Sequence, residues 1–185
     1  MKEVKIRNYQ IISILFIWIV GTLLQFTYKW SNENFLVGIF STVNESVWEH
    51  LKLVYFPTVI TIIFGYFYIK KYSPNYLCSK VIGMLTAMTF IVTFFYTYTG
   101  IIGKNISLVD ISSFFVSIII GEYISYILMK SQYKCGNKNY LITLIILFVC
   151  FVIFTFVTPK LNIFKDPLTN KYGIIRQWNL KIKIF

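Results

Sequence analysis

The residues best suited to chemistry begin in the stretch STVNESVWEHLK at 41–52, which holds Glu45, Glu49 and His50, the only histidine of the chain. Carboxylates beside an imidazole can bind a cation, hold a divalent metal ion or exchange protons. The same stretch precedes an apolar run, and Thr42 with Glu45 fits a capping box at the start of a helix. These residues therefore have two interpretations, one wall of a polar site or a solvated helix entrance.

Two further carboxylates lie in a later apolar run. Asp110 begins that run, and Glu122 follows 12 residues along, roughly 18 Å deeper at the helical rise. A carboxylate near the middle of a membrane costs about 2.5 to 3.5 kcal/mol on insertion scales, so it needs a partner or a task. We expect Glu122 to be protonated or hydrogen-bonded to a Thr or Tyr hydroxyl, because desolvation disfavours the charged form.

Hydroxyl groups and small residues follow helical spacings in the same part of the chain. A hydroxyl stripe consists of Thr86, Thr89, Thr93, Tyr96 and Thr97. Small residues recur at every fourth position at Ser113, Ser117, Gly121 and Ser125. The first pattern could face a polar site, whereas the second favours close packing between helices.

The elements that position these residues are apolar enough to be membrane spans. The 185 residues are 57% hydrophobic and 19% aromatic, with a mean hydropathy of +0.67, well above the usual soluble composition. A crossing helix needs about 20 apolar residues. Five runs meet this length, at about 9–28, 47–69, 79–101, 109–129 and 139–158. The sequence predicts an all-α integral membrane bundle of five transmembrane helices, multi-pass in the cell membrane.

Positive charge sets the expected orientation and excludes one class of partner. Nine Lys and Arg residues flank the predicted spans on the side of the N-terminus and three on the other side, while six more occupy the C-terminal tail. Giving the first helix precedence over the tail predicts a cytoplasmic N-terminus. The net charge of +11 lies between apolar runs and at the ends, which fits anionic lipid and not nucleic acid.

The predicted organisation is a five-span domain at 1–158 and a basic tail at 159–185 with the turn DPLTNKYG. The segment NFLVGIF is too short to cross and could lie in the interface. The three cysteines are odd in number and form no C-x-x-C pair, so the sequence indicates neither a disulfide framework nor a zinc site.

Because consecutive spans alternate in direction, the polar residues are expected to meet in one half of the bundle. The predicted pocket residues are Glu45, Glu49, His50, Tyr96, Asp110 and Glu122. The leading hypothesis is a pocket that binds or conducts a cation, proton or small polar ligand. Five helices without an internal repeat are few for a self-contained carrier, so transport would require a homo-oligomer or a partner membrane subunit.

Two other functions remain open. A metal-dependent membrane hydrolase or transferase could act on a lipid or lipid-linked substrate, with a divalent metal held by Glu45, Glu49, His50 and Asp110. One histidine favours manganese, calcium or magnesium over zinc. Alternatively, the chain is a structural or regulatory subunit whose polar residues only pack. No G-x-S-x-G, H-E-x-x-H, Walker or Rossmann motif is present.

Four segments carry a resemblance that covers nearly the whole chain. They are VNESVWEHLKLVYFP at 43–57, FYTYTGIIG at 95–103, DISSFFVSIIIGEYISY at 110–126 and DPLTNKYGI at 166–174. Together they resemble an uncharacterised family of small multi-pass membrane proteins, a domain of unknown function, from clostridia and related Firmicutes. The resemblance implies a multi-pass bacterial membrane protein and supplies no catalytic roles.

Overall fold

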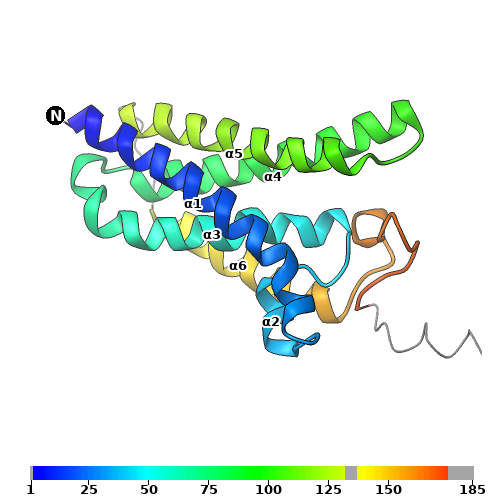
Figure 1. Cartoon of the computed structure of the whole chain (residues 1–185). Helices are drawn as coiled ribbons and strands as arrows, with labels where there is room; N and C mark the ends of the chain where they lie inside the picture. The colour runs from blue at the N-terminus through cyan, green and yellow to red at the C-terminus, as the bar shows by residue number, and fades with distance from the viewer. Residues whose placement is uncertain (1, 132–136, 175–185) are drawn as a thin grey trace, which may run out of the picture.

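A computed structural model describes residues 2–131 and 137–174, and the regular elements in those ranges are helical (Figure 1). The long helices are α1 (Lys2–Trp30), α3 (Val47–Tyr68), α4 (Tyr76–Ile102), α5 (Ser107–Lys130) and α6 (Asn137–Phe156). The short elements are α2 (Phe35–Phe40) and the 3-10 turns η1 (Lys70–Tyr72) and η2 (Asn162–Phe164). One isolated antiparallel bridge, between Lys165 and Tyr172, is the only strand-like pairing in the described ranges. The all-α prediction is confirmed for these residues.

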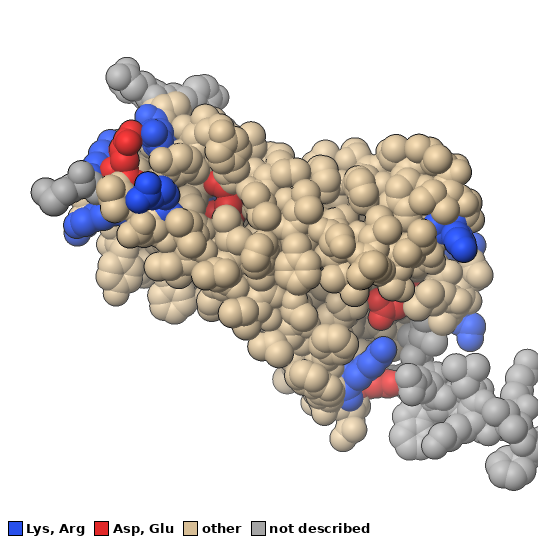
Figure 2. Space-filling model, turned by 45° about the horizontal axis from the view of Figure 1, so that its top comes forward, with Lys and Arg blue, Asp and Glu red and all other residues tan. Residues whose placement is uncertain are grey.

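Five helices are long enough and apolar enough to cross a membrane, α1, α3, α4, α5 and α6. Each corresponds to one predicted run, although the runs 47–69 and 139–158 extend one and two residues past the ends of α3 and α6. Their outward faces are apolar, as at Ile19, Phe67 and Ile146, which are exposed. A helix at a water interface would turn its polar side outward. Figure 2 shows Lys and Arg side chains toward the ends of the molecule and a wide band of other residues between them. This surface suits a lipid environment.

The α4–α5 hairpin is the most extensive helix pair, and it lies along α1 and α3, while α6 contacts α3 and α4 (Figure 1). The predicted small-residue seam of α5 packs against α4. Gly83 and Gly121 pass so closely that a Cβ on either glycine would meet the carbonyl oxygen of the other. Close approach of this kind is what small residues permit in membrane helices.

The start of α3 differs from the predicted capping box. Ser46, not Thr42, is the N-cap, and its Oγ accepts a hydrogen bond from Glu49 N at 3.4 Å. Asn44 Oδ1 in turn accepts from Ser46 N at 2.8 Å. The sequence contains two consecutive Ser/Thr-x-x-Glu patterns, at 42–45 and 46–49, and the later one is used. Glu45 therefore precedes the helix.

The sequence indicated no disulfide framework, but Cys78 is disulfide-bonded. Cys150 is a free thiol, and Cys135 lies outside the described residues. The predicted basic tail is described only as far as Ile174.

The glycine contact gives a stability test. Gly83→Ala should lower the thermal unfolding midpoint of the detergent-solubilised protein, because the added methyl group overlaps the backbone of α5. Gly100→Ala is the matched control in α4, since nothing lies within 4 Å of its added Cβ, and it should keep or raise the midpoint by helix propensity. Equal midpoints for the two variants would contradict this helix pairing.

Candidate functional site

Three predicted site residues, Glu45, His50 and Asp110, line one cavity of about 350 Å³. Its walls come from the end of α1, the starts of α3 and α5, the end of α4 and the tail turn. Figure 1 shows the α4–α5 connection, the start of α3 and the tail turn at the same end of the bundle. Aromatic side chains complete the walls, from Phe26, Phe95, Phe114 and Phe115. The cavity thus combines two carboxylates and an imidazole with aromatic side chains.

The hydrogen bonds of His50 determine what its ring presents to the cavity. His50 Nδ1 lies 2.9 Å from the carbonyl oxygen of Ser46. A carbonyl oxygen only accepts, so Nδ1 carries the proton. His50 Nε2 lies 3.5 Å from Glu45 Oε2. In the neutral imidazole, Nε2 is then an acceptor facing a carboxylate, and this pair needs a proton or a bound cation between its atoms.

Asp110 is held in place by a tyrosine of the neighbouring helix. The hydroxyl of Tyr98 donates to Asp110 Oδ1 and accepts from Ile106 N at 3.2 Å. Tyr96, which the sequence predicts as a pocket residue, is 38% exposed and is not among the residues that line the cavity. Two positions along a helix rotate a side chain by roughly 200°, so Tyr98 and Tyr96 face opposite ways.

The tail turn closes the cavity from outside the helical bundle. Asp166 Oδ1 accepts from Leu168 N at 2.7 Å and from Thr169 N at 3.0 Å. Its other oxygen accepts from Glu45 N at 3.3 Å, and Leu168 lines the cavity. Asp166 was missed as a site residue, although its turn motif was recognised. The turn is therefore tied directly to the segment that carries Glu45.

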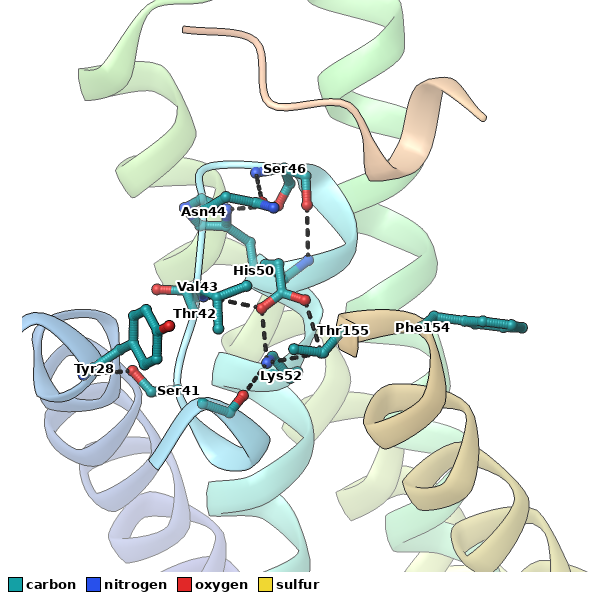
Figure 3. A network of polar contacts seen from close by, with 12 residues as sticks. Tyr28, Ser41, Thr42, Val43, Asn44, Ser46, His50, Lys52, Phe154 and Thr155 are labelled. Atoms are coloured by element: carbon teal, nitrogen blue, oxygen red, sulfur yellow. Dashed lines mark hydrogen bonds and ion pairs between the residues drawn. The ribbon is translucent and has the colours of Figure 1, made fainter. Parts of the chain in front are cut away.

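Glu49 does not line the cavity and forms a buried ion pair with Lys52, which Figure 3 shows close to Thr155. Lys52 Nζ lies 2.7 Å from Glu49 Oε2, and the two side chains are 0% and 3% exposed. The carboxylate also accepts from Val43 N at 3.0 Å and from the Thr155 hydroxyl at 2.9 Å. Lys52 donates to Gly38 O at 2.9 Å and to Thr155 Oγ1 at 3.1 Å. This network joins α2, α3, α6 and the loop before α3.

Glu122 forms a second buried ion pair, with Lys80. The two carboxylate oxygens lie 2.5 and 2.7 Å from Lys80 Nζ, and the side chains are 0% and 6% exposed. The expectation of a protonated or hydroxyl-bonded Glu122 is therefore wrong, because its partner is an ammonium group. Gln10 of α1 donates to the Glu122 carbonyl at 3.1 Å, and the ammonium lies 5.1 Å from the centre of the Tyr9 ring.

Both buried lysines were read from the sequence as charges flanking the spans. For Lys80, the way in which α4 and α5 pair could have identified Glu122 as its partner. In an antiparallel pair in which Gly83 faces Gly121, a residue one turn before Gly83 faces one just after Gly121. That register places Lys80 beside Glu122. For Lys52 the i,i+3 spacing to Glu49 on the same helix was an available signal, whereas nothing local identifies its other partners, Gly38 O in α2 and Thr155 in α6.

The hydroxyl stripe of α4 does not face the cavity. Thr86, Thr93 and Thr97 each donate to a carbonyl oxygen of their own helix. In residues 2–131 and 137–174, no group of three or more His, Cys, Asp and Glu side chains is placed to hold a metal ion. Of the four suggested metal ligands, Glu49 belongs to the ion pair with Lys52.

These features define a class of protein: a helical bundle with five segments able to cross a membrane and, at one end, a mostly apolar cavity that Glu45, His50 and Asp110 also line. The chain belongs to DUF6512, a family of unknown function, whose family model matches residues 1–174. The four segments that carry the resemblance all lie within this range. No curated protein and no solved structure matches the chain.

The ion pair between Lys80 and Glu122 predicts a strong dependence on its partner. Glu122→Leu should lower the free energy of unfolding by about 3 to 5 kcal/mol, because it leaves a buried ammonium without a counter-charge. The double variant Lys80→Met/Glu122→Leu should recover most of this loss. Unfolding in detergent measures both. A loss below about 1 kcal/mol, as for exposed pairs, would contradict the burial of the pair.

The bridging hydroxyl of Thr155 gives a finer test of the network around Lys52. Thr155→Val keeps the shape and removes both hydrogen bonds, and it should cost about 1 to 3 kcal/mol of stability. Thr143→Val is the control in the same helix, because Thr143 is only half-buried and its hydroxyl donates to Asn139 O of its own helix. Equal unfolding free energies for the two variants would show that the network adds nothing.

Proposed function

We propose that this protein is a cell-membrane protein that binds a small organic cation in the cavity formed by Glu45, His50 and Asp110. The observation that carries the proposal is the facing pair of acceptors, His50 Nε2 and Glu45 Oε2, 3.5 Å apart. Because Ser46 O fixes the proton on Nδ1, a ligand ammonium group, which has several N–H donors, satisfies both acceptors at once. Asp110 supplies a second carboxylate in the same cavity.

The rest of the cavity favours an organic cation over a bare ion. Aromatic faces attract ammonium groups and also accept apolar ligand atoms, and Phe26, Phe95 and Phe114 line the walls. A volume of about 350 Å³ lies at the lower end of the range for small-molecule sites. A ligand with an ammonium group and a short apolar or aromatic portion fits this combination of acidic and aromatic lining residues.

The layer beneath the cavity supports binding over conduction. Leu53 lines the cavity and is fully buried. Ile17 and Ile118 are fully buried and line a void of about 10 Å³, near the lower limit for one water molecule. The ammonium groups of Lys52 and Lys80 are also buried in the bundle and would repel a passing cation. A cation that enters this cavity leaves by the same end.

The proposed orientation places the cavity on the outer side of the cell membrane. Lys52 and Lys80 are paired inside the bundle, so one lysine is removed from the count of flanking positive charges on each side of the membrane. The side of the N-terminus still has the larger number of positive charges. With a cytoplasmic N-terminus, the starts of α3 and α5 lie outside. The ligand is then taken from the external medium.

Benzylammonium chloride is a suitable probe because it combines a primary ammonium with one aromatic ring. It should bind the purified protein in neutral detergent and raise its thermal midpoint. Asp110→Asn and Glu45→Gln should each weaken the affinity at least tenfold in calorimetric titration, which corresponds to about 1.4 kcal/mol. Glu3→Gln is the control for charge, since Glu3 is an exposed acid at the other end of the bundle, paired with Lys130.

The controls decide between chemical classes. Benzyl alcohol and benzenesulfonate should bind weakly, because neither brings a cationic N–H donor. Equal binding of benzyl alcohol would show a purely apolar cavity. Binding of Mn²⁺, Ca²⁺ or Mg²⁺ that is lost in Asp110→Asn, with no effect of benzylammonium, would replace the organic cation by a metal ion.

A further inference from the structure

We propose that a groove between α1 and α3, at the end of the bundle opposite the cavity, binds an anionic phospholipid. The groove encloses about 560 Å³. Lys5, Asn8 and Lys71 lie at one end of it, and Ile12, Phe16 and Phe64 continue it along the helices. A headgroup phosphate between the two lysines and an acyl chain along the apolar part would fill it.

The two lysines converge on one tyrosine without a carboxylate. Lys5 Nζ lies 4.9 Å and Lys71 Nζ 5.2 Å from the centre of the Tyr72 ring, and Lys5 also donates to Tyr72 OH at 2.8 Å. Tyr72 lies in η1, outside the spanning helices, and its hydrogen bond from Lys5 lowers the pKa of its phenol below the ordinary value. A lowered phenol pKa marks a positive local potential, which favours an anion.

All seven acidic side chains of the chain lie in the described residues, so the partner or location of each carboxylate is known. Glu3 pairs with Lys130, Glu49 with Lys52 and Glu122 with Lys80. Glu45 and Asp110 line the cavity at the other end, and Asp166 caps the tail turn. The seventh, Glu33, lies in the loop after α1, also away from the groove. No side-chain carboxylate is left for Lys5 and Lys71, so an external anion is the fitting partner.

The dimensions and surroundings of the groove favour a lipid over a free phosphate. Lys5 and Phe16 are 11 residues apart on α1, roughly 16 Å at the helical rise, and one leaflet of hydrocarbon is about 15 Å thick. Ile12, Phe64 and Tyr68 are exposed along the groove. This surface faces lipid when α1 and α3 cross the membrane. Figure 2 shows positive side chains gathered at the N-terminal end, at the left. Basic pockets between spanning helices are typical sites for anionic headgroups.

The test titrates the full-length protein in neutral detergent with dioleoyl-phosphatidylglycerol and counts retained lipids by native mass spectrometry. Phosphatidylglycerol should bind at least tenfold more tightly than dioleoyl-phosphatidylcholine and should weaken as salt rises. Lys5→Gln/Lys71→Gln should lose at least tenfold in affinity. Lys104→Gln, which removes an exposed charge in the α4–α5 connection at the opposite end, should bind like the original chain.

Each contrary result identifies another occupant or none. Competition by millimolar inorganic phosphate as strong as that by phosphatidylglycerol would show a site for free phosphate and overturn the lipid. Equal retention of the two lipids, or an unchanged affinity in the double lysine variant, would remove the headgroup contact. A dimer that dissociates on substitution of Phe64 by serine, without lipid, would assign the groove to a second copy of the chain. Circular dichroism of each variant verifies that the helices remain.

Discussion

Two lysine ammonium groups stand in the apolar interior, and each can stay charged there only beside a carboxylate. Lys52 and Glu49 tie α3 to α2, to α6 and to the loop that precedes α3. Lys80 and Glu122 tie α4 to α5, and Gln10 adds α1 to that pair. Between them, the two pairs therefore involve all six α-helices of the described residues, α2, α3 and α6 around Lys52 and α1, α4 and α5 around Lys80. Their specificity comes from hydrogen-bond geometry, which apolar packing alone does not supply.

The first pair also determines what the cavity contains. With Glu49 turned inward to Lys52, the acids left at the entrance of α3 and α5 are Glu45 and Asp110, and His50 faces Glu45. The tail turn then reaches back to Glu45 through Asp166. Acid and imidazole groups thus collect at one end of the bundle, while the unpaired lysines of the groove lie at the other. The two sites therefore differ in charge. The cavity with its two carboxylates suits a cation, and the groove with its two lysines suits an anion.

Several predictions from the sequence were close and failed by a small shift. The cap of α3 lies at Ser46 instead of Thr42, and Tyr98 instead of Tyr96 reaches Asp110. Both errors come from choosing among neighbouring residues of the same type, which a periodic pattern cannot separate. Lys52 and Lys80 stand near the ends of apolar runs, where a lysine usually extends to the headgroups. Only the position of Glu49 and Glu122 relative to them reverses that expectation.

The sequence by itself determined the helices, their apolar length and the small-residue seam, because these depend on the order of residues along one segment. The tertiary structure decided which charges pair, which carboxylates face a cavity and which lysines remain without a counter-charge. Except for Glu49 and Lys52, which are one turn apart on α3, such choices depend on distances of a few ångströms between segments far apart in the chain, since the attraction between buried charges falls with separation. Hydropathy fixes how many residues a span contains, but not which face of that span meets its neighbour.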